Sequence, residues 1–116
     1  MAIRDLLTDR MTVETPDTPT KDGSAGPVQS FSPVENNVPA QITPLSSGQR
    51  VTAAMAGMFI SHKILTLYDG IQQGYRVKDQ ESGVYIRVLG VQRIPARGGI
   101  ELHYLVDGEE VKDGAP

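Results

Sequence analysis

Apolar and polar residues alternate in short runs along most of this chain, and no other feature restricts its fold as strongly. Such runs occur at Met11–Thr15, Tyr75–Lys78, Val84–Ile94 and Ile100–Val106. Strict alternation over a few residues is typical of strands with one buried face. Short segments rich in Gly, Pro, Asp or Ser separate the runs, which favours antiparallel neighbours over a parallel sheet. We therefore predict a mainly β protein, folded as an antiparallel barrel or sandwich.

Two further strands are predicted near the middle of the chain. In the segment Val38–Leu45, the two prolines cannot donate ladder hydrogen bonds, so this strand is expected at an edge or at a bend. In Phe59–Tyr68, apolar residues occupy both faces. A small barrel has one inner face to fill, so the second face needs a cover from a helix or from a neighbouring subunit. Gly90, in the middle of a later run, predicts a bulge or a bend.

One helix is expected, over residues 47–56. Ser46 and Gln49 have capping-box spacing, in which each side chain bonds the backbone amide of the other residue. The apolar stripe follows the helical period, and it consists of Val51, Ala54, Met55 and Met58. Met55, Met58, Phe59 and Ile60 form an apolar step around the helix end. The step predicts either ordinary core or a partner surface, because Met adapts well to interfaces.

The remaining segments are predicted to be irregular. Residues 1–10 form an N-terminal arm with one helical turn, and residues 17–27 form a long loop with a turn at Asp22-Gly23. We expect this loop to become ordered only in an assembly, because it has few apolar residues to offset its ordering cost. Residues 107–116 are acidic, and they are expected to form a flexible tail.

Composition limits the classes of protein that fit. A chain of 116 residues with 39% hydrophobic content supports a single domain, here 1–116. The net charge of -3 argues against a protein that binds nucleic acid mainly through phosphates. The absence of cysteine excludes disulfides, thiolate nucleophiles and cysteine-based zinc sites. No apolar run has the length of a membrane span, so the protein is expected to remain in a cytoplasm until it is assembled.

The sequence offers no signature of catalysis. His62 and His103 fall on separate strands without a second ligand at metal-binding spacing, and each is interpreted as a strand-face residue. Nucleophile-elbow and phosphate-loop motifs are absent. The pair Glu109-Glu110 is interpreted as part of the solvated tail, not as a catalytic dyad. We therefore expect no enzyme activity and no catalytic, cofactor or metal site.

Several segments together resemble one family. Val38–Arg50 looks like a strand that ends in a Pro-Leu-Ser step before a short helix, and Ser61–Tyr68 like the strand that follows. Tyr75–Val77 with Val84–Val88 resembles a closing hairpin, and Asp22–Val28 is similar to an Asp-to-Gly turn. This series is similar to the head–tail joining proteins of tailed bacteriophages, called head-closure or stopper proteins. The chain departs from the family at two places, since the family often has Trp near Phe31 and Glu near Gln49 and Arg50.

The resemblance implies a small β-barrel with one helix that forms a ring, hexameric or dodecameric, in the virion neck. Its partners would be other copies of itself, the portal–adaptor complex and the tail terminator or tail tube, and packaged DNA would pass through the lumen. The protein would close the filled head and provide the tail-docking platform. The candidate interface residues are Asp22, Gly23, Arg50, Met55, Met58, Phe59, Arg93 and Arg97.

Two other functions remain open at this stage. A tail terminator or another neck ring would share the same architecture. An OB-like barrel that binds single-stranded nucleic acid would need aromatic platforms on a basic groove. Tyr75, Tyr85 and Tyr104 could stack on bases, although their alternating positions are also those of barrel-facing residues.

Overall fold

The computed structural model describes residues 3–17, 20–21, 27–28, 30–57 and 59–111. A 3-10 helix, η1 (Ile3–Leu6), comes first. One α-helix, α1 (Ser47–Met55), lies between the fourth and fifth strands. The strands are β1 (Asp9–Pro16), β2 (Thr20–Lys21), β3 (Pro27–Val28), β4 (Phe31–Pro44), β5 (His62–Thr66), β6 (Arg76–Asp79), β7 (Tyr85–Ile94) and β8 (His103–Val111).

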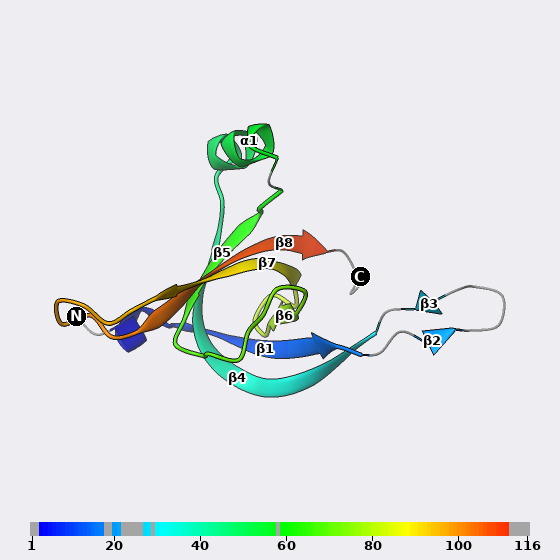
Figure 1. The fold of residues 1–116 in the computed structure, drawn as a ribbon, viewed down its shortest axis with the longest axis horizontal. Helices are drawn as coiled ribbons and strands as arrows, with labels where there is room; N and C mark the ends of the chain where they lie inside the picture. The colour runs from blue at the N-terminus through cyan, green and yellow to red at the C-terminus, as the bar shows by residue number, and fades with distance from the viewer. Residues whose placement is uncertain (1–2, 18–19, 22–26, 29, 58, 112–116) are drawn as a thin grey trace.

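Six of these strands close into an antiparallel barrel, in the order β1-β4-β5-β8-β7-β6 and back to β1 (Figure 1). The prediction of a mainly β, antiparallel barrel with one short helix is therefore confirmed. The small strands β2 and β3 pair only with each other, in a separate two-stranded ladder. Closure gives each barrel strand two neighbours over part of its length, which limits the exposed edges.

The core fills the inside of the barrel with residues from all six strands. Alternation places these residues inward, and most are completely buried. The cluster contains Met11, Val13, Val38, Ala40, Ile64, Ile71, Val77, Ile86, Val88 and Val106. Gly108 on β8 belongs to the same interior, because a Cβ there would collide with Ile86 on the neighbouring strand. The barrel thus has a complete core without any contribution from α1.

Three register shifts interrupt the described barrel pairings, and one of them, between Val13 and Glu14 of β1, leaves Val34 of β4 without a partner on β1. The predicted irregularity at Gly90 is confirmed, since the register of β7 on β8 shifts between Val88 and Gly90. A second bulge lies on β4, where Asn36 and Asn37 face only Thr12 of β1. Asn37 has a φ of 57°, in the left-handed region that Asn tolerates better than most residues. Thr12 Oγ1 donates to the Asn36 side-chain oxygen at 3.2 Å and stabilises this bulge.

Several predicted boundaries need correction. The arm expected over residues 1–10 is shorter, because β1 begins at Asp9, and the strand expected at Phe59–Tyr68 is limited to His62–Thr66. The strand expected at Val38–Leu45 begins seven residues earlier, at Phe31, because the whole first half of β4 pairs with β1. The expected loop 17–27 contains the paired strands β2 and β3, and its predicted turn at Asp22-Gly23 lies outside the described residues. The expected flexible tail begins too early, since residues 107–111 belong to β8 and pair with β7; the residues after Val111 are not described.

Candidate partner-binding surface

Helix α1 lies outside the barrel, above the ends of β4 and β5 (Figure 1). The predicted capping box is present: the Gln49 amide donates to Ser46 Oγ at 3.3 Å, and the Ser46 amide donates to Gln49 Oε1 at 2.9 Å. These bonds satisfy two backbone donors at the helix start. None of the residues of α1 is buried, so the helix is held by its cap and by the two chain segments that attach it to the barrel.

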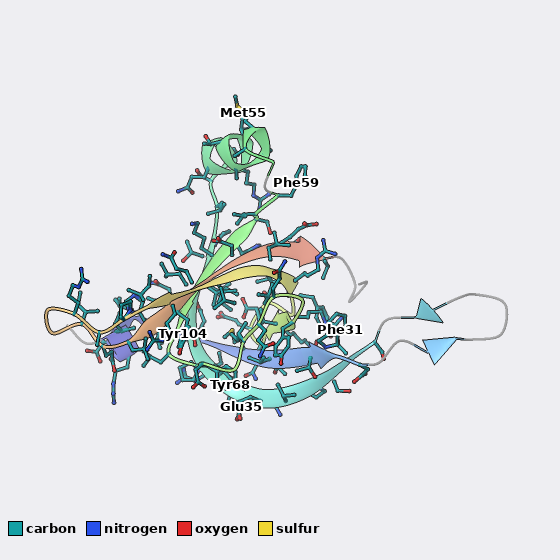
Figure 2. All side chains as sticks on the ribbon, viewed as in Figure 1. Phe31, Glu35, Met55, Phe59, Tyr68 and Tyr104 are labelled. Atoms are coloured by element: carbon teal, nitrogen blue, oxygen red, sulfur yellow. The ribbon has the colours of Figure 1, made fainter. Side chains whose placement is uncertain are left out.

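The apolar stripe of α1 points away from the barrel and not into it. Met55 is 85% exposed and Val51 is 59% exposed, and the following Phe59 is 68% exposed. Figure 2 shows Met55 on the outer side of α1 and Phe59 beside the base of the helix. Of the described residues of the apolar step, Ile60 is buried, whereas Met55 and Phe59 are exposed. The interpretation of this stripe as core is therefore wrong for Met55 and Phe59, and an exposed apolar surface remains.

The opposite face of α1 borders an open groove of about 600 Å³ between the helix and the outer surface of β5 and β8. The helix contributes its polar and small residues to the groove, and Leu45 and Ile60 contribute apolar surface. At its edge, the Lys63 ammonium lies 3.4 Å from Asp107 Oδ1 in a partly exposed ion pair. The groove is lined largely by uncharged groups, with one neutralised charge pair.

The segment that returns from α1 to the barrel is fixed by Ser61 and His62. Ser61 Oγ lies 2.9 Å from His62 Nδ1 and accepts a hydrogen bond from the Glu110 amide at 2.6 Å. His62 is buried, and this burial lowers the pKa of its imidazole below 6.5, with Arg50 acting in the same direction and Glu110 opposing both. The predicted strand-face position of His62 is confirmed, on an inward-facing site at the start of β5.

A buried ion pair joins β1 to β6. Arg76 Nε donates to Glu14 Oε1 at 2.6 Å, and both side chains are almost fully shielded from solvent. The Arg76 guanidinium also stacks on the rings of Phe31 and Tyr85, 4.3 Å from each centroid. This cluster connects β1, β4, β6 and β7. Its charged and aromatic groups already contact one another within the subunit.

The turn predicted between the runs Val84–Ile94 and Ile100–Val106 is present between β7 and β8, and it forms a projecting tip (Figure 1). Of the predicted interface residues, Arg97 is exposed in this turn, and Arg93 is exposed near the end of β7. Ile100, expected inside a strand, is instead 50% exposed, because it lies in the turn and β8 begins only at His103. The connection is therefore longer than the turn expected at Pro95–Gly99, and it extends to Leu102.

The predicted interface residues therefore fall into two groups. Arg50, Met55 and Phe59 lie exposed on or beside α1, and the other group forms the β7–β8 tip. Asp22, Gly23 and Met58 lie outside the described residues.

Glu109, expected in a solvated tail, instead forms an ion pair with Arg87, and the Arg87 Nη2 to Glu109 Oε2 distance is 3.3 Å. Within the described parts of the chain, no three His, Asp or Glu side chains gather as metal ligands, and no helix has the length and apolarity of a membrane span.

The architecture defines the class of protein: a closed six-stranded antiparallel β-barrel with one external helix. Its fold is similar to that of protein SF1141 from Shigella flexneri 2a, determined in solution. The two structures align with a TM-score of 0.63 at 17% identity, over 92% of this chain and 95% of the other. At this identity the likeness shows the fold alone. No protein-family model matches the chain, and no curated protein is significantly similar to it.

Proposed function

We propose that this chain is a structural protein of the bacteriophage neck, which forms a ring between the portal–adaptor complex and the tail. In this role it closes the DNA-filled head and provides the docking platform for the tail. The observation that carries the proposal is the exposed apolar stripe of α1. Because the barrel core is complete without the helix, the helix serves a contact outside the subunit.

The shape and charge of the subunit support a role in assembly. The β7–β8 hairpin and the β2–β3 ladder extend beyond the barrel on opposite sides (Figure 1), and the molecule measures 55 × 33 × 25 Å. Such projections allow a small subunit to reach its neighbours in a ring. A net charge of -3 also suits a lumen through which DNA must pass, because few phosphates would be held.

The OB-like alternative has less support from the arrangement of aromatic side chains. A single-strand binder stacks bases on aromatic faces along a basic groove. Here the rings of Phe31 and Tyr85 both stack on Arg76, so these faces are already occupied. Phe59 is widely exposed, but it follows the helix and lies beside a stripe without charges.

The test is to remove the gene from a phage that carries it. Particles assembled without the protein should be tailless, and their DNA should be accessible to nuclease; complementation with the intact gene should restore tailed, nuclease-resistant particles. A tail terminator would give a different result, because heads would keep their DNA while the tails would be abnormal. Tailed and infectious particles made without the protein would contradict any essential neck role.

A further inference from the structure

The exposed side of α1 combines an apolar surface with a partial negative charge. Val51, Met55 and the nearby Phe59 expose more than half of their surface. The last turn contains no basic residue, so the negative end of the helix dipole has no cationic side chain of its own. Isolated helices of nine residues are only marginally stable in water. A partner that covers this side should therefore carry both an apolar and a basic group.

The tip of the β7–β8 hairpin has this combination. Ile100 is half exposed, and the exposed Arg97 has no acidic partner within ion-pair distance among the described residues. Two backbone hydrogen bonds between Arg97 and Ile100, of 2.9 and 3.0 Å, hold these residues opposite each other. Gly98 and Gly99 close the turn at φ values of 59° and 83°, in the left-handed region that favours glycine. Because glycine has no side chain, these two residues add no bulk to the tip. The tip is therefore narrow and presents an apolar and a basic residue together.

These two surfaces cannot meet within one molecule, because the hairpin tip and α1 project on different sides of the barrel (Figure 1). We propose that the β7–β8 tip of one copy docks on α1 of the next copy, with Ile100 against Met55 and Phe59 and Arg97 at the carboxyl end of the helix. Arg50, near the amino end of α1, would repel Arg97 and so favours this orientation. The contact is heterologous, and repeated contacts of this kind close into a ring when the rotation allows.

This contact is small and rests on the proposed function, since it would join the subunits of the neck ring. One helical turn and one hairpin tip bury less than the roughly 1,000 Å² expected of a stable interface. A single contact should therefore be weak, and free subunits should remain largely monomeric. A ring held on its portal–adaptor platform gains from many such contacts at once, because tethering raises the effective concentration of each surface.

The chain has no cysteine, so introduced thiols report the contact directly. The purified full-length variants Met55→Cys and Ile100→Cys are mixed and oxidised at high protein concentration. We expect the mixed dimer to exceed both homodimers, and a double variant to form a ladder of longer oligomers. The matched control is Val34→Cys on β4, whose side chain is 48% exposed against 50% for Ile100; it should not cross-link to Met55→Cys.

A second arm tests the charge. Arg97→Gln should slow cross-linking roughly two- to five-fold, and Arg97→Lys should keep most of the rate, because the dipole of α1 requires only a positive charge. Equal cross-linking with the Val34→Cys control, a dominant Met55→Cys homodimer, or no mixed dimer would overturn the inference. The two claims are tested independently. Gene removal tests the proposed function, and cross-linking tests the contact, so a failure of one experiment does not imply a failure of the other.

Discussion

Arg76 makes the most buried ion pair found among the described residues. It forms a 2.6 Å bond to buried Glu14 and stacks between two rings. Replacing it with Met would leave the Glu14 carboxylate buried without its charged partner, and breaking such a pair costs about 3–5 kcal/mol. We expect Arg76→Met to lower the free energy of unfolding in urea by about this amount. The control is Arg87→Met, which breaks a partly exposed pair with Glu109 and should cost about 1 kcal/mol or less. Equal losses would contradict this.

His62 should make stability depend on pH near neutrality. Burial lowers the pKa of its imidazole in the folded state below 6.5, so the unfolded chain binds more protons in this region. The contribution of His62 is therefore complete above pH 6.5 and decreases as the pH falls from 6.5 through the lower folded-state pKa. We expect His62→Gln to flatten this part of the curve of unfolding free energy against pH. The control is His103→Gln, which replaces the other histidine; an unchanged slope in His62→Gln would refute the assignment.

At the scale of elements, α1 should behave as a unit that unfolds separately from the barrel. Ser46→Ala removes the capping oxygen, which costs about 1 kcal/mol of helix stability. Because α1 buries none of its residues, we expect faster amide hydrogen exchange in α1 by roughly five-fold and an unchanged midpoint of thermal unfolding. Ser47→Ala, one position further and exposed, is the matched control and should alter neither measurement. A lower unfolding midpoint in Ser46→Ala would show that the helix supports the barrel.

Features that depend on local sequence were predictable, whereas features determined by pairing with another strand were not. The capping box at Ser46 and the bulge at Gly90 are local signals, and both are confirmed. The first half of β4 was missed because prolines and Asn36-Asn37 interrupt its alternation; its pairing with β1 holds it extended. The last part of β8 was missed because Glu109 was interpreted as solvated, although Arg87 on the adjacent strand neutralises it.

The candidate surface was predicted only in part, for a related reason. The composition of the apolar step allowed both core and partner surface, and the periodicity of α1 could not show which way its stripe points. That direction depends on how the chain leaves β4 and enters β5, which is a property of the barrel. Ile100 was likewise expected inside a strand, because only the pairing of β7 with β8 shows where β8 begins.

At the scale of the whole molecule, the barrel and the helix should be separable. Leu45 and Ser61 are already joined by a backbone hydrogen bond of 2.9 Å, which makes 46–60 an insertion at the tip of the β4–β5 hairpin. Replacing 46–60 with an Asn-Gly turn suits a two-residue hairpin loop, and it should cost little beyond the burial of Ile60, about 2 kcal/mol.

We expect this deletion variant to keep a β-rich far-ultraviolet spectrum and cooperative thermal unfolding, but to lose assembly. In the phage it should give the tailless, DNA-releasing particles expected from complete removal of the gene. The intact chain carrying Ser47→Ala is the control for both measurements. An unfolded deletion variant would show that α1 is part of the folding unit. A folded variant that still supports tailed particles would show that the helix is not the surface through which the subunits assemble.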